Sequence, residues 1–307
     1  VVTKEGTDIT AENIEEVYPL YYPKQTAPAD TYAQIIKDLT EAIDDAPANN
    51  AGDKTVLSKS VAKALLAKAY AEKPARDYTK VLQYCNDVIA DGFKLNPSFG
   101  DIYALNSAGT DLKNRSTAES ILEVNFFPGG GNWVTWMFGK DLLDPEANFS
   151  WAKWVTPTRD LIAAFTAEND NIRKNESIVY YQASWSNYYP SSSYPFMYKM
   201  RSAVHSIIKM RFADILLLKA EALANLDGAS NLEAAETIVN QVRARVSLPA
   251  LPASVKASKE SMLNAILKER RLELAFEGQR WFDLVRYEKV EEVMNTLNSR
   301  DSGRLPL

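Results

Sequence analysis

The sequence predicts an all-α protein, built as a scaffold of helix-turn-helix units with an aromatic-rich, irregular loop region inserted between them. Three observations predict this class. Two distant segments repeat one pattern of small and large apolar residues, a charge-dense helical pattern lies near the end of the chain, and 17 of the 32 aromatic residues gather between the repeats. The 307 residues suffice for one large domain. We divide it into a helical pair at 30–92, a loop-rich region at 93–206, and a second pair with a closing helix at 207–293.

The repeated pattern is typical of a tetratricopeptide-like helix-turn-helix scaffold. Residues 62–72 read AKALLAKAYAE, and residues 213–223 read ADILLLKAEAL. Each segment is followed by a polar break and a second helix with apolar residues at helical spacing, at 77–91 and 231–245. Both pairs have about the tetratricopeptide length. Two pairs are fewer than the roughly three that a stable solenoid needs, so the rest of the chain must supply packing partners.

Local signals predict where these helices begin and end. Asp77 has the chemistry of an N-cap, and Gly92 that of a C-terminal stop. A further helix precedes the first pair, with Asp30 as its predicted cap. Its apolar residues share one face: Tyr32, Ile35, Ile36, Leu39 and Ile43.

The last strong helical pattern spans residues 259–293 and contains RRLELAFEGQRWFDLVRY at 270–287. Oppositely charged residues stand there at i,i+3, the distance at which side chains on a helix meet. The predicted pairs are Arg270 with Glu273, Glu277 with Arg280, and Asp283 with Arg286. Gly278 predicts a kink, a helix end or a close backbone contact inside this element.

The loop-rich region differs in composition from the helical pairs. Residues 126–198 hold over half of the aromatic residues in about a quarter of the length, and Gly and Pro interrupt any long helix. We expect loops, short helices and a small hairpin near residues 178–185.

Aromatic rings in these loops are the candidate ligand-binding groups. Two pairs of indoles stand three residues apart near Gly and Pro turns, and such rings can stack on the C–H faces of a sugar while nearby amides bind its hydroxyls. The alternative is that the rings form a small core under the loops. The candidate ligand-binding residues are Asn132, Trp133, Trp136, Trp151, Trp154, Trp185, Tyr188 and Tyr189.

Composition argues against several other functions. A net charge of −5 offers no basic surface for nucleic acid, and no apolar run approaches the roughly 20 residues of a membrane span. Cys85 is the one cysteine and His205 the one histidine, so neither a cysteine-rich zinc site nor an imidazole-based triad with a nucleophile elbow is predicted. No phosphate loop or metal spacing appears, and we expect no cofactor. Calcium held by loop carboxylates stays open.

The segment ERRLELAFEGQRWFDLVRY resembles the SusD/RagB family of nutrient-binding outer-membrane lipoproteins of Bacteroidetes. MRFADILLLKAEALANL, VNQVRARVSLPAL and VAKALLAKAYAEKPARDYTKVLQYCNDVIADGFKL resemble other runs of that family, in matching order. The resemblance spans about residues 58–287.

The resemblance implies a protein without enzymatic activity that captures oligosaccharides at the cell surface. It also implies delivery to a SusC-like TonB-dependent transporter, and anchoring in the outer membrane by a lipid on a cysteine that this chain does not contain. The family's usual N-terminal part is expected to be missing. On this view the motif at 270–287 is expected to hold the scaffold together through Arg270, Arg271, Glu273, Glu277, Arg280, Trp281, Asp283 and Arg286.

Two alternatives stay open. A peptide-binding helical-repeat receptor or adaptor would use the concave face of the helical pairs instead of the loops. A glycosidase would need two carboxyl groups about 5 to 9.5 Å apart across a cleft, whereas the glutamates at 269, 273 and 277 stand among arginines that should keep them ionised.

Overall fold

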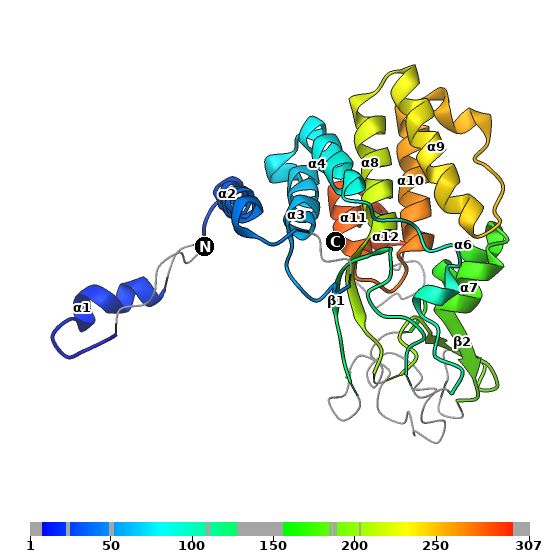
Figure 1. The fold of residues 1–307 in the computed structure, drawn as a ribbon, viewed down its shortest axis with the longest axis horizontal. Coiled ribbons are helices and arrows are strands. Elements are labelled where there is room, and N and C mark those ends of the chain that lie inside the picture. The colour runs from blue at the N-terminus through cyan, green and yellow to red at the C-terminus, as the bar shows by residue number, and fades with distance from the viewer. Residues whose placement is uncertain are drawn as a thin grey trace.

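Two helical hairpins form the scaffold of the structure, a computed structural model that describes residues 8–22, 25–48, 52–108, 111–127, 156–183, 186, 189–202 and 204–296. Helices α3 (Lys59–Ala71) and α4 (Tyr78–Ala90) make the first hairpin, and α8 (Phe212–Leu226) and α9 (Ala229–Arg245) make the second. Helix α4 packs on α8, and the two hairpins stand side by side (Figure 1). The helix-turn-helix prediction is confirmed.

The apolar core lies where the two hairpins meet. Ala64, Ala67 and Ala71 on α3 are fully buried, and their small side chains let the helix axes approach closely. Most residues of α8 are buried, since neighbouring helices cover it on several sides. This burial explains why α8 reads as a nearly continuous apolar run instead of a narrow stripe.

Local signals set some of the helix ends as predicted. The Asp77 carboxylate accepts hydrogen bonds from the backbone nitrogens of Thr79 at 2.9 Å and Lys80 at 3.1 Å, and Gly92 follows α4 with a φ of +93°. The predicted cap at Asp30 is wrong. Helix α2 (Pro28–Asp45) begins at Pro28, two residues before Asp30, so Asp30 lies inside its first turn. A proline fits the first helical position because no backbone donor is needed there.

The closing element is not continuous. Helix α10 (Lys259–Glu273) packs against α8 and α9, and is followed by α11 (Arg280–Arg286) and α12 (Val290–Asn295). Gly278 adopts a φ of +76° between α10 and α11, which confirms the predicted interruption. Phe276 also has a positive φ, of +65°, so the chain reverses through two left-handed residues.

Two small antiparallel sheets lie at one end of the scaffold (Figure 1). Strand β1 (Ser120–Val124) pairs with β4 (Ile207–Arg211), a pairing that the sequence did not predict. Strands β2 (Ile178–Tyr181) and β3 (Tyr194–Met197) form a hairpin that begins where the sequence predicts one, but its connection is longer. The remaining described helices are α1 (Ile14–Val17), α6 (Arg159–Ala167) and α7 (Asn171–Ser177), with short 3-10 turns at Tyr18–Tyr21, Lys73–Ala75, Gly100–Ile102 and Ala253–Ala257.

Candidate functional site

Most of the sequence-predicted ligand residues cannot be placed. Seven of the eight lie outside the described residues: Asn132, Trp133, Trp136, Trp151, Trp154, Trp185 and Tyr188. The eighth, Tyr189, is half-buried, and its hydroxyl donates a hydrogen bond to the Pro157 carbonyl at 2.7 Å. The Arg159 guanidinium lies 5.5 Å from the centre of its ring, and Tyr194 meets it edge-on at 5.7 Å. Tyr189 therefore belongs to a small aromatic core.

The β2–β3 hairpin places aromatic rings both in this core and on the surface. Tyr194 and Phe196 on β3 are buried and pack against Ala183. Tyr180 and Tyr181 on β2 are 42% and 38% exposed, so parts of both rings face solvent. Each such ring offers a flat apolar face and a polar hydroxyl, the combination that suits stacking on a sugar. Buried rings and partly exposed rings therefore both occur in one hairpin.

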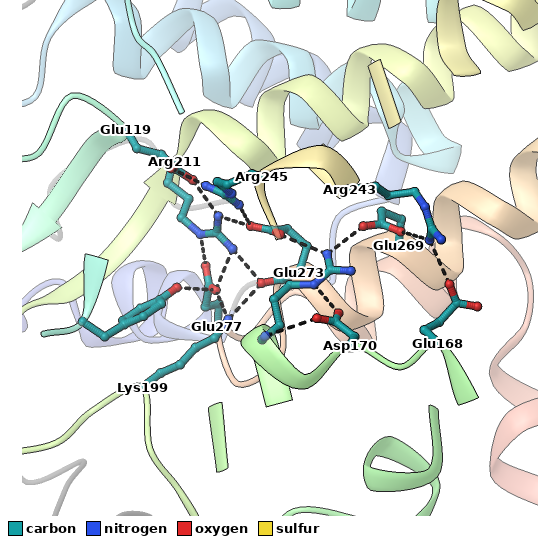
Figure 2. Close-up of polar contacts among 12 residues, drawn as sticks. Glu119, Glu168, Asp170, Lys199, Arg211, Arg243, Arg245, Glu269, Glu273 and Glu277 are labelled. Carbon is teal, nitrogen blue, oxygen red and sulfur yellow. Dashed lines mark hydrogen bonds and ion pairs between the residues drawn. The ribbon is translucent and has the colours of Figure 1, made fainter. Parts of the chain in front are cut away.

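A buried network of ion pairs ties the loop-rich region to the scaffold (Figure 2). At its centre, Glu273 at the end of α10 accepts hydrogen bonds from Arg211 Nη1 at 2.6 Å and Arg173 Nη1 at 3.1 Å, and it also pairs with Arg245. Arg211 ends β4, Arg173 lies on α7 and Arg245 ends α9. Four elements that are distant in sequence are therefore joined through one carboxylate.

The network extends from Glu273 in two directions. Glu277 accepts from Arg211 Nε at 2.7 Å, from Lys199 Nζ at 2.6 Å and from the Tyr103 hydroxyl at 3.0 Å. On the other side, further pairs join Arg173 and Arg243 to carboxylates of α10 and of the segment around α6 and α7. Their partners are Glu168, Asp170 and Glu269.

The electrostatics of the network favour structure over acid–base chemistry. Burial by itself would raise the pKa of Glu273, but Arg245, Arg211 and Arg173 outweigh burial and hold that pKa well below its ordinary value. Arg211 and Lys199 lower the pKa of Glu277 against the same effect. For Glu273 and Glu277 the expectation that basic neighbours keep them ionised is confirmed, so neither is set up to donate a proton.

The predicted i,i+3 pairs are mostly wrong. Only Asp283 with Arg286 forms, at 2.7 Å. Arg270 instead binds Asp214 at 2.7 Å and Asp283 at 2.9 Å, because the break before α11 lets α10 and α11 fold against each other. Trp281 does not join the buried scaffold as expected: it is 53% exposed, on the outer face of α11 together with Phe282 and Val285.

Sequence reasoning missed all five cations of the network: Arg173, Lys199, Arg211, Arg243 and Arg245. One signal was present for two of them, since Arg243 and Arg245 end a helix beside an apolar stripe. The carboxylates that pair with these two arginines come from other elements, and the spacing of residues along the sequence does not predict which elements come together.

Two of the cavities on the described surface are large enough to hold part of a ligand. The larger, of about 610 Å³, is an apolar groove between α2, α3 and α11, and the smaller, of about 440 Å³, lies beside Lys199 and Glu277. Apolar side chains of the groove include Ile35, Leu39, Leu65, Leu122 and Phe282. No group of three or more His, Cys, Asp or Glu residues within the described ranges could hold a metal ion, and no helix there is long and apolar enough to cross a membrane.

Comparisons with known proteins give one consistent family. SusD-like protein P38 of Formosa agariphila is 45% identical over 106 residues, which are 33% of this chain and 20% of that protein. A laminarin-binding SusD-like protein of known structure matches with 27% identity and a TM-score of 0.67, over 89% of this chain and 64% of its own. Surface glycan-binding protein A from Bacteroides thetaiotaomicron, solved in complex with laminarihexaose, matches with 18% identity and a TM-score of 0.66, over 86% of this chain and 62% of its own.

The chain thus spans less than two thirds of the length of these solved relatives, and its matched segment is a fifth of the curated one. The family model described as the SusD family matches residues 118–301. That match covers more than half of the chain, including β1, the second hairpin and the ion-pair network. On this evidence the chain belongs to the SusD family.

Proposed function

We propose that this protein captures oligosaccharides or polysaccharide through the loop-rich end of the molecule. The observation that carries the proposal is the structural match, over 89% of the chain and at 27% identity, with a protein described as laminarin binding. The exposed rings of Tyr180 and Tyr181 supply surfaces of the required chemistry. Trp133, Trp136, Trp151 and Trp154 remain candidates for the same surface.

The proposed function is binding without bond cleavage. Membership of the SusD family supports this, because the related proteins are described as glycan-binding. The chemistry of the ion-pair network agrees, since glycoside hydrolysis needs one carboxylic acid of raised pKa and arginines lower the pKa of both Glu273 and Glu277.

Calorimetric titration with a panel of oligosaccharides that includes laminarihexaose tests the proposal. The wild-type protein should bind at least one member, and the double variant Tyr180→Ala/Tyr181→Ala should bind it more weakly, since each productive stack contributes about 0.5 to 1.5 kcal/mol. The quadruple variant of the four loop tryptophans to Ala tests the sequence-predicted rings in the same way. Absence of binding to the whole panel would contradict the proposed function.

Delivery of the glycan to a SusC-like TonB-dependent transporter at the outer membrane, with the full-length protein anchored there by lipid, is the second part of the proposal. Family membership supports it. Co-purification of the full-length protein with the transporter from detergent-solubilised outer membranes tests it. Recovery of the two proteins in separate fractions, with the lipid anchor intact, would count against a stable pair.

One observation favours peptide binding as a second candidate function. The groove of about 610 Å³ is lined mainly by apolar side chains and runs along α2 and α3, where an amphipathic peptide could lie. Titration of the same preparation with peptides and with sugars discriminates the two functions. Peptide binding that weakens in Leu65→Asp, with no response to sugars, would favour this second candidate.

A further inference from the structure

An exposed aromatic ring lies just beyond the end of β1. Phe127 is 61% exposed, and the Arg115 guanidinium carbon lies 5.2 Å from the centre of its ring. A guanidinium can cover only one face of a ring, and the large exposed fraction shows that much of Phe127 stays open to solvent. The guanidinium therefore supports the ring, and much of the ring stays available to a ligand.

Three hydrogen bonds hold Arg115 in place. Its Nη1 donates to Ser206 Oγ at 2.9 Å, and its Nη2 donates to Asp111 Oδ1 at 2.8 Å and to the Val204 carbonyl at 2.9 Å. These contacts join the segment before β1 to the segment before β4. The guanidinium is fixed before any ligand arrives, and the ring that packs on it is restrained with it. Little conformational entropy is therefore lost when a ligand binds the ring.

Two polar groups that are linked to the ring through Arg115 keep hydrogen-bonding capacity. Ser206 Oγ donates to Asn125 Oδ1 at 2.7 Å, which orients the Asn125 amide. Among the described residues, Asn125 Nδ2 then has no acceptor. Asp111 Oδ1 accepts from Arg115 and from the Leu112 backbone nitrogen, while Oδ2 has no donor in the same part of the chain, and the Asp111 side chain is 40% exposed.

We propose that Phe127, Asn125 and Asp111 form a subsite for an uncharged sugar ring, a refinement that rests on the proposed glycan-binding function. Phe127 stacks on the C–H face of the ring, Asn125 Nδ2 donates to one hydroxyl oxygen and Asp111 Oδ2 accepts from another hydroxyl. The antiparallel strands β1 and β4 extend between the scaffold and the end of the molecule where the β2–β3 hairpin lies (Figure 1). The subsite and the exposed tyrosines therefore belong to the same end.

Charge explains why the sugar should be neutral. The positive charge of Arg115 is paired with Asp111 at 2.8 Å, and its two terminal nitrogens also donate to Ser206 Oγ and to the Val204 carbonyl. The group that remains open to a ligand is a carboxylate oxygen. A uronic acid or sulfated sugar would face that negative charge without a compensating cation from Arg115.

Calorimetry with neutral and uronate-containing oligosaccharides of equal length tests the subsite. Phe127→Ala should weaken binding of the neutral ligand by about twofold to tenfold, the effect of one aromatic stack. Trp281→Ala, which removes a similarly exposed ring from α11 on the scaffold, should leave that affinity unchanged. Unaltered binding by Phe127→Ala, while the wild type binds, overturns the subsite and leaves the proposed function standing. Failure of the wild type to bind any sugar overturns the proposed function and the subsite with it.

The variant Asp111→Asn tests the charge argument with the opposite sign. Removing the carboxylate frees the positive charge of Arg115, so affinity for the uronate-containing ligand should rise by about twofold or more at low salt and less at high salt. Thermal unfolding of each variant checks that the fold is intact. A wild-type preference for uronates, or an unchanged ratio in Asp111→Asn, rejects the selectivity for neutral sugars.

Discussion

At the scale of single residues, the one histidine shows how burial decides chemistry. His205 is 1% exposed, its Nδ1 donates to the Ser206 carbonyl at 2.8 Å, and its ring stacks on Tyr103 at 6.1 Å. Burial is the largest cause that lowers the pKa of His205 to about 4. At neutral pH the ring is therefore an uncharged packing group, as expected for a histidine without a catalytic partner.

We predict that His205 makes stability fall with pH below neutrality. Between pH 6.5 and about 4, an unfolded histidine takes up a proton while folded His205 stays neutral, so the unfolded state binds more protons. The free energy of unfolding should then decrease by about 1.4 kcal/mol per pH unit well below pH 6.5. Urea unfolding at pH 7 and pH 5.5, above the range of most carboxylates, measures this loss. His205→Gln should remove it, and an equal loss in that variant would be evidence against the assignment.

Ion pairs at the same scale show the limit of local spacing. The sequence paired Arg270 with Glu273 because both share a helix face. In the structure both residues pair with other elements, since a buried charge binds the nearest opposite charge in space, whatever the sequence separation. The spacing predicted that these residues form ion pairs, but it did not predict their partners.

At the scale of elements, helices were predictable where a local signal marks the end. Asp77 and Gly92 have such signals, and α4 ends where they indicate. Strands β1 and β4 were missed because short segments of mixed apolar and polar residues look alike in a strand and in a helix, and β4 passes directly into α8 without a break.

We predict that the two aspartates once expected to cap helices differ in their contribution to stability. Asp77→Ala should lower the free energy of unfolding by about 1 kcal/mol, because Thr79 and Lys80 lose the acceptor of their backbone nitrogens. Asp30→Ala is the matched control. It removes an exposed carboxylate from the first turn of α2 that caps nothing, and should cost only a few tenths of a kcal/mol. Equal losses in denaturant unfolding would argue against the cap.

At the scale of the whole molecule, the buried ion-pair network joins the loop-rich end to the scaffold. Glu273 contacts arginines from α7, β4 and α9, so one negative charge forms ion pairs with three elements at once. The candidate site was less predictable than the scaffold for a related reason. Whether a ring such as Phe127 or Tyr180 is exposed depends on neighbours that only the fold brings close. The helical pairs, in contrast, repeat a pattern that can be recognised in the sequence itself.

We predict that Glu273→Gln is strongly destabilising. The substitution keeps the shape but leaves three buried arginines facing a neutral amide, and breaking a buried pair in this way costs about 3–5 kcal/mol. Glu41→Gln, the same change in a pair with Lys37 in which both side chains are more than 60% exposed, should cost less than about 1 kcal/mol. Comparable losses of unfolding free energy in the two variants would refute the network's role in joining the elements.

The distribution of tryptophan gives the molecule a built-in optical reporter. Five of the six indoles lie between residues 133 and 185, and the sixth, Trp281, stands on the outside of α11. In Trp281→Phe, all indole emission must come from the loop-rich region of the sequence, residues 93–206, while circular dichroism in the far ultraviolet follows the helices. Sugar-induced changes in one signal and heat-induced changes in the other can therefore be recorded on a single sample, without an attached dye.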